Sequence, residues 1–175
     1  MKKLLFGSLI AATALAGCGS DISTEVKASS YDGTYLKIGV IGEQPDFHEN
    51  NVKFMTLSFE ELEDTNRVSS KFDAVFITKN NLKQADEEKY VKVYQKLDVP
   101  TFFLETTKGF LPFVVEDLTY ANASEVSDAY VSGYLQEKKD SYRFWEYGLN
   151  NDQKNDKNVK DVYSQIFKTI SEVKA

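Results

Sequence analysis

The 175-residue chain contains one cysteine and one histidine. A single cysteine excludes a disulfide within the chain, and a single histidine provides no second imidazole for a metal site. The sequence also lacks Gly-x-Ser-x-Gly, a signature of serine hydrolases, and Gly-x-Gly-x-x-Gly, which marks dinucleotide-binding folds. We therefore expect neither a cofactor nor thiol catalysis.

Clustered positive charge is missing as well. Lys and Arg total 21 against 27 Asp and Glu, and without the first 17 residues, which carry two lysines and no acid, the balance is 19 to 27, a formal charge of −8. Binding to nucleic acid or to anionic lipid headgroups needs clustered Lys and Arg, so neither is expected. Aromatic residues are plentiful, with 12 Phe and 10 Tyr, which is enough for the core of one folded domain.

The N-terminus has three parts in a characteristic order. Lys2 and Lys3 precede an apolar stretch that begins at Leu4, and this stretch ends in Leu15-Ala16-Gly17-Cys18. A basic start, a short apolar centre and small residues at the end are typical of a secretory signal peptide. The stretch is shorter than the roughly 18 to 20 residues that a membrane-spanning helix needs.

The segment that ends in Cys18 resembles the lipobox of bacterial lipoproteins, and the resemblance covers residues 1–18. It implies that the thiol of Cys18 receives a diacylglyceryl group, that residues 1–17 are removed and that the new N-terminus is often fatty-acylated. Two or more lipid chains are what stable anchoring requires. The resemblance thus implies a cell-membrane lipoprotein whose domain lies on the extracytoplasmic side.

Two regions follow the predicted signal peptide. Residues 18–32 are predicted to be the lipidated cysteine and a flexible tether, because residues 19–32 are polar, rich in serine and without apolar periodicity. A short strand around Ile22 and Val26 is the alternative. Residues 33–175 are predicted to form one α/β domain that folds without the tether.

The first half of the domain alternates strands with helical patterns. Four buried strands are predicted, at residues 35–41, 52–59, 72–78 and 101–104. A helix between the last two, capped by Asp86 and ended by Pro100, gives the crossover unit of a parallel sheet. The connection at residues 43–51 is short, because parallel crossovers usually take about a dozen residues or more.

The second half is predicted to add a short strand at 113–115, a hairpin of strands 129–136 and 141–147, and an amphipathic helix at 158–174. A helix in place of the hairpin is the alternative. The resulting fold class is α/β: a three-layer Rossmann-like or flavodoxin-like domain with a partly parallel sheet, an added β-hairpin and a C-terminal amphipathic helix.

Only one group of side chains combines the types that ligate metals. Asp46, His48 and Glu49 follow the first predicted strand, and ligands in open α/β sheets bind at the carboxyl ends of strands. An ordinary solvated loop whose acids face water would have the same composition, and the chain offers only one imidazole, so no metal site is predicted. Ser132 has no histidine near it in sequence, and we predict no catalytic residue.

Aromatic residues concentrate in the predicted hairpin and are either half-buried sheet residues or an interface for proteins, peptides or sugars; they are Tyr130, Tyr134, Tyr142, Phe144, Trp145 and Tyr147. The favoured function is a non-catalytic domain that binds a protein partner or a small-molecule ligand. The alternatives are an envelope hydrolase or metal-assisted enzyme using the loop after the first strand, and an immunity or exclusion-type surface protein. An enzyme should bring polar groups together near His48, whereas a partner-binding protein should expose a flat apolar patch.

Overall fold

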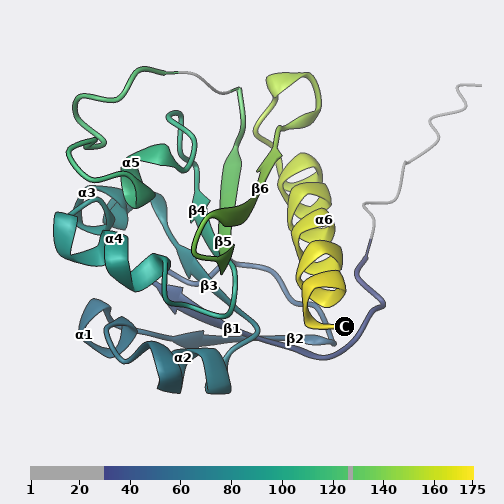
Figure 1. The fold of residues 1–175 in the computed structure, drawn as a ribbon. Helices are drawn as coiled ribbons and strands as arrows, with labels where there is room; N and C mark the ends of the chain where they lie inside the picture. The colour runs from purple at the N-terminus through teal and green to yellow at the C-terminus, as the bar shows by residue number, and fades with distance from the viewer. Residues whose placement is uncertain (1–29, 126–127) are drawn as a thin grey trace, which may run out of the picture.

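The computed structural model describes residues 30–125 and 128–175, which form an α/β domain around a six-stranded sheet (Figure 1). The predicted signal peptide, Cys18 and the tether residues before Ser30 lie outside the described residues. The strands are β1 (Leu36–Ile41), β2 (Val52–Thr56), β3 (Ala74–Ile77), β4 (Thr101–Leu104), β5 (Val131–Lys138) and β6 (Ser141–Tyr147). Their order in the sheet is β2-β1-β3-β4-β5-β6.

The sheet is mixed. β1 pairs in parallel with β2 and β3, and β3 pairs in parallel with β4, whereas β5 and β6 are antiparallel additions. The parallel part has the order 2-1-3-4, which is the flavodoxin-like order of doubly wound sheets. The predicted α/β class, the partly parallel sheet and the added hairpin are therefore confirmed.

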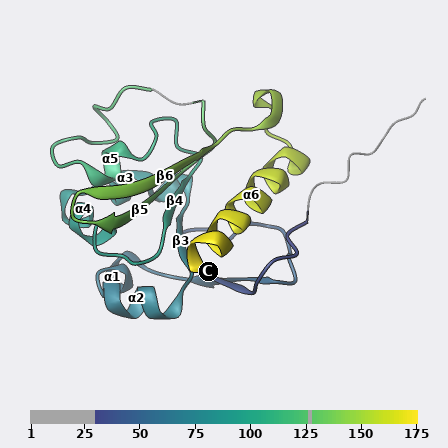
Figure 2. The same cartoon turned by 45° about the vertical axis from the view of Figure 1, so that its right-hand side comes forward.

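Helices cover both faces of the sheet. Five short helices lie on one face: α1 (Phe59–Leu62), α2 (Thr65–Lys71), α3 (Leu82–Ala85), α4 (Glu88–Tyr94) and α5 (Leu111–Val114). The opposite face is covered by the single long helix α6 (Asp156–Lys174), which stands apart from the others in Figure 2. Two 3₁₀ turns, η1 (Lys79–Asn81) and η2 (Asn150–Asp152), complete the elements.

Successive side chains of a strand point to opposite faces of the sheet, so the domain has one hydrophobic core on each face. In β3, Ala74 and Phe76 face α6, whereas Val75 and Ile77 face the short helices, and all four are buried. A strand that is buried on both faces reads as a continuous apolar run, which is why β3 and β4 are evident in the sequence. Close packing against Phe102 explains why residue 133 in β5 is a glycine, because a Cβ there would lie 2.6 Å from Cε1 of Phe102.

The short crossover between β1 and β2 contains no helix. Residues 42–51 cross on the α6 face as an irregular segment, and the Phe47 ring centroid lies 4.8 Å from that of Tyr163 and 5.9 Å from that of Phe54. At its end, Asn51 O accepts a hydrogen bond of 2.8 Å from Leu36 N. One partly buried aromatic side chain thus takes the place of a helix, which explains how so few residues connect parallel strands.

The core begins within the predicted tether. Tyr31 is 5% exposed, and its ring meets Phe167 of α6 edge-on at 5.6 Å between centroids. Its hydroxyl donates to Thr34 O at 2.8 Å. Among the described residues, packing against α6 therefore includes Tyr31, two residues before the predicted domain boundary.

Several predicted elements differ from the structure. The predicted strand at 113–115 is wrong, because this segment belongs to helix α5, where Pro112 suits the first turn and Phe113 stacks on Phe103 at 3.8 Å. The second strand ends at Thr56 rather than residue 59, because Ser58 and Glu61 form a capping box that starts α1.

Asp86 is not the N-cap of the next helix. Helix α4 begins at Glu88 with Glu87 at the N-cap position, and the Asp86 carboxylate accepts a hydrogen bond from the Tyr120 backbone N instead. The hairpin and the C-terminal helix are confirmed, and α6 begins at Asp156 because the Asn155 side chain caps it. Among the residues that the structure describes, no helix has both the length and the apolar composition needed to cross a membrane.

Candidate functional site

The carboxyl ends of β1, β3 and β4 meet at one edge of the sheet. The chain leaves β1 toward β2 on one side and leaves β3 toward β4 on the other, so this edge is a topological switch point, where doubly wound folds bind ligands. Two adjoining cavities of about 330 and 590 Å³ open here. They share five lining residues and together are called the strand-end cleft; the shared residues are Pro45, Asp46, Glu105, Lys154 and Tyr163.

Gly42 brings the chain from β1 into the cleft. Its φ is +110°, which favours glycine, and a Cβ would lie 2.0 Å from Thr78 Oγ1 and 2.3 Å from Asn81 Nδ2. Asn81 Nδ2 donates to Thr78 Oγ1 at 3.0 Å, which fixes the turn after β3. The ends of β1 and β3 are thus in close contact, and residues 43–46 are directed along the cleft.

Glu105 lies at the centre of the cleft, directly after β4. Its φ is +57°, a left-handed conformation that costs a residue with a Cβ about 1–2 kcal/mol. The backbone holds it there, since Glu105 N donates to Tyr130 O at 2.7 Å. Strained non-glycine residues of this kind concentrate at functional sites.

Two lysines contact the Glu105 carboxylate. Its Oε2 lies 2.6 Å from Lys154 Nζ and 4.0 Å from Lys79 Nζ. Lys79 follows β3, and Lys154 precedes α6, so three separate parts of the chain converge on one carboxylate. The Glu105 side chain is 27% exposed, which places this ion-pair group between surface and core.

Aromatic rings form the wall of the cleft. Burial and the neighbouring Glu105 carboxylate raise the pKa of Tyr130 to about 12. Burial, with smaller contributions from Tyr130 and Glu105, raises the pKa of Tyr163 well above its ordinary value. Both phenols are therefore protonated at neutral pH, and their hydroxyls can donate hydrogen bonds to a ligand.

The rim of the cleft carries further acids. Glu43, Asp46 and Asp156 are exposed and form no ion pair among the described residues. Lys160 also lines the larger cavity, but its Nζ lies 3.5 Å from Glu49 Oε1. Free negative charge therefore exceeds free positive charge around the cleft.

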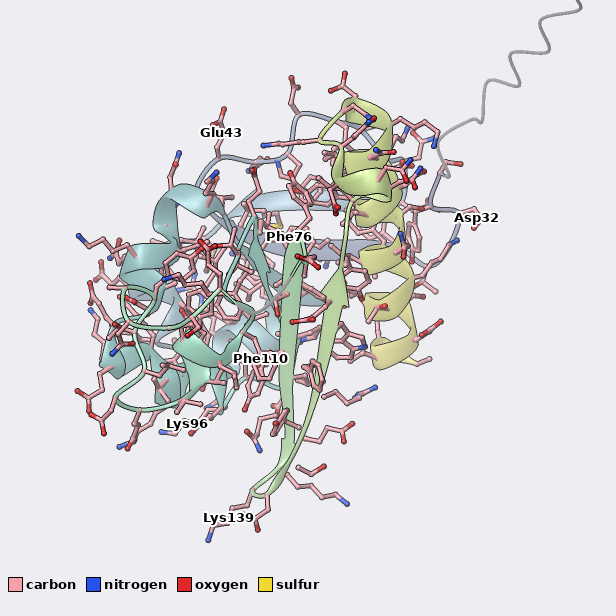
Figure 3. The ribbon with its side chains drawn as sticks, turned by 90° about the horizontal axis from the view of Figure 1, so that it is seen from above. Asp32, Glu43, Phe76, Lys96, Phe110 and Lys139 are labelled. Atoms are coloured by element: carbon pink, nitrogen blue, oxygen red, sulfur yellow. The ribbon has the colours of Figure 1, made fainter. Side chains whose placement is uncertain are left out.

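Figure 3 shows Glu43 at one end of the molecule and Lys139, at the hairpin turn, at the other.

The predicted candidates Asp46, His48 and Glu49 do not come together. Asp46 lines the strand-end cleft, His48 is exposed and lines neither cavity, and Glu49 is 8% exposed and paired with Lys160. Within residues 30–125 and 128–175, no three His, Cys, Asp or Glu side chains are grouped to hold a metal ion. Ser132 is fully buried in β5, and its Oγ has no hydrogen-bond partner among the described residues.

The aromatic residues of the hairpin have different environments. Tyr134 and Tyr147 are buried, Tyr130 and Trp145 are partly buried, and only Tyr142 and Phe144, at 50% and 54%, are exposed. The exposed pair lies beside Phe110, whose ring stacks on Phe144 at 5.1 Å. Leu104 of β4 pairs with Val131, so the hairpin turn extends from the end of the sheet opposite the strand-end cleft. The rings of Phe110, Tyr142 and Phe144 therefore take no part in the cleft, whereas Tyr130, which precedes β5, lines it.

Sequence reasoning missed Lys79, Glu105 and Lys154. Lys79 and Glu105 each come directly after a predicted strand, and this position is the signal that could have identified them. Lys154 and the orientation of Tyr163 had no such signal, because both depend on how α6 packs against the sheet. Another cavity, of about 700 Å³, is bordered by Thr107, Asp128 and Leu149. None of its lining residues takes part in an ion pair found among the described residues.

Comparison of the chain with models of protein families, with curated proteins and with solved structures found no match. The strand-end cleft and the N-terminal sequence are therefore the features of the chain that bear on its function.

Proposed function

We propose that this chain is a lipid-anchored extracytoplasmic protein whose domain binds a small polar ligand in the strand-end cleft without catalysing a reaction. The observation that carries the proposal is the Glu105 carboxylate, which a strained backbone directs into a cavity at the switch point of the sheet. The cavity of about 590 Å³ lies within the range of small-molecule sites. The lipid anchor rests on the lipobox resemblance of residues 15–18.

The chemistry of the lining supports binding rather than catalysis. Its charged groups are carboxylates and lysines that are already paired or exposed, and its phenols are protonated at neutral pH. The imidazole of His48 lies outside the lining, so the hydrolase alternative lacks its general base there. Fixed donors and acceptors of this kind suit the recognition of a polar ligand.

Binding is tested by the melting temperature of the domain with four classes of small compound: alkylamines, carboxylates, amino acids and sugars. A ligand that binds the native state raises the melting temperature in a saturable way. We expect at least one class to do so, and Glu105→Gln to abolish the rise. Glu137→Gln is the matched control, because Glu137 forms an ion pair of the same 2.6 Å length with Arg143 on the hairpin.

Two outcomes would contradict ligand binding in the cleft. One is the absence of a saturable rise with all four classes. The other is a rise that persists unchanged in Glu105→Gln, which would place the ligand elsewhere.

The anchor is tested separately. Cys18→Ser removes the only thiol of the chain, so the protein should leave the detergent-extracted membrane fraction and lose its lipid mass. A wild-type protein without lipid mass, together with an equally membrane-bound mutant, would refute the anchor.

A further inference from the structure

The strand-end cleft already holds an ammonium group, that of Lys154. Lys154 Nζ lies 2.6 Å from Glu105 Oε2 and 5.8 Å from the centre of the Tyr130 ring. A carboxylate together with the face of an aromatic ring is an arrangement that proteins use to bind organic cations. The position of Lys154 Nζ is therefore a site for a cation, occupied by a side chain of the protein itself.

Lys154 is held there weakly. Its side chain is 58% exposed, and it belongs to the irregular segment between η2 and α6. Exposed ion pairs contribute little to stability, and lysine loses considerable side-chain entropy when it is fixed in one place. Lys154 can therefore turn outward into solvent without unfolding any element of the domain.

The remaining charges favour a cation in its place. With Lys154 turned away, Glu105 keeps only Lys79, at 4.0 Å, and the three rim acids Glu43, Asp46 and Asp156 have no ion-pair partner among the described residues. Lys160 is already bound to Glu49. The excess negative charge around the cleft would repel an entering anion and attract an entering cation.

The cavity also has room for the body of the ligand. The larger part of the cleft, about 590 Å³, has Phe47, Tyr130 and Tyr163 in its wall. Aromatic walls bury aliphatic groups and attract cations through the ring faces. The Glu105 carboxylate thus provides a charged contact, and Phe47 and the two tyrosine rings provide apolar contacts.

We propose that the ligand of the strand-end cleft is an organic ammonium compound, a primary or methylated alkylamine. Its ammonium group displaces Lys154 Nζ and binds between Glu105 and Tyr130. This inference rests on the proposed function. It makes Lys154 a built-in competitor of the ligand, so that removing Lys154 strengthens binding.

The test measures by calorimetry the dissociation constants of n-butylammonium, tetramethylammonium and n-butyrate at constant ionic strength. Wild type should bind one or both ammonium ions and not butyrate. Lys154→Ala should bind the ammonium ion about fivefold more tightly, as expected for removal of an exposed ion pair. Glu105→Gln should weaken binding at least tenfold, as expected for loss of a charged partner. Lys157→Ala is the matched control, because Lys157 pairs with Asp161 on α6 outside the cleft.

The relative affinities of the two ammonium ions distinguish a primary amine, which needs N–H donors, from a methylated one, which relies on the ring faces. Weaker ammonium binding in Lys154→Ala, or butyrate binding that needs Lys154, would overturn the ammonium inference while leaving ligand binding in the cleft intact. If the wild type showed no Glu105-dependent binding of any compound class, that result would instead refute the proposed function.

Discussion

Replacing Tyr31 by alanine tests where the folded domain begins. Tyr31 is almost fully buried against Phe167, and its hydroxyl donates to Thr34 O at 2.8 Å. Thr34 Oγ1 in turn lies 3.0 Å from Ser171 Oγ near the end of α6. This segment therefore links the start of the described chain to the last helix.

The magnitude follows from the contacts. Removing a buried aromatic ring costs about 3–5 kcal/mol, and the lower end applies because Tyr31 lies in an irregular segment before β1, which can shift toward the space left by the ring. We expect Tyr31→Ala to lower the free energy of unfolding by about 3 kcal/mol, a large part of the 5–15 kcal/mol typical of a domain. Tyr31→Phe removes only the hydrogen bond and should cost about 1 kcal/mol.

The assay is urea unfolding, followed by the fluorescence of Trp145, on chains beginning at Ser30 and at Gly33. The chain from Gly33 should resemble Tyr31→Ala in its midpoint, with an unchanged dependence on urea. Equal midpoints for the two chains would show that Tyr31 contributes nothing, and the predicted boundary at residue 33 would then stand.

Three further predictions concern the cleft and its surroundings. Gly42→Ala should destabilise the domain by more than about 2 kcal/mol in urea unfolding, because its φ of +110° and the 2.0 Å approach to Thr78 Oγ1 leave no room for a Cβ; an unchanged midpoint would contradict this. Burial raises the pKa of Tyr147 to about 12, so the unfolded chain releases this proton first as the pH rises. The stability from the neutral phenol is complete below pH 10 and is lost between about pH 10 and 12, a decline that Tyr147→Phe should flatten. His48→Ala should change stability by less than about 0.5 kcal/mol, and zinc should leave the melting temperature unchanged; a zinc-dependent rise that needs His48 would refute this.

Strong local patterns predicted the central elements. Residues 101–104 form an apolar run after Pro100, and α6 repeats apolar side chains at helical spacing, so both matched the structure. Residues 113–115 have the composition of a strand, yet Phe113 gains more by stacking on Phe103 from a helical turn. Here tertiary packing outweighs local propensity.

The candidate site was predictable only in part. Asp46 belongs to the one group of metal-ligating side-chain types and follows the first strand, and the positional reasoning applied to the later strands leads to Lys79 and Glu105. The loop containing His48 and Glu49 has no pattern that reveals which side chains turn inward. The ion pair of Glu105 with Lys154 joins residues 49 positions apart and depends on the packing of α6, which no local pattern encodes.

Helix α6 has a consequence for when this protein can fold. One face of the sheet, including Leu36, Phe76 and Phe102, is covered mainly by α6, with Tyr31 and Phe47 beside it, and α6 and Tyr31 lie at opposite ends of the described chain. Until α6 is present, that face remains open to water, and the contacts that close it are long-range and slow to form.

A nascent chain without α6 therefore lacks a stable native state. For an extracytoplasmic protein of the kind proposed, this is useful, because the chain stays unfolded while it crosses the membrane and folds only after the last turns of α6 have crossed. The same dependence means that truncating α6 should lower the yield more than inserting a short tag at the hairpin turn, where Lys139 is exposed to solvent.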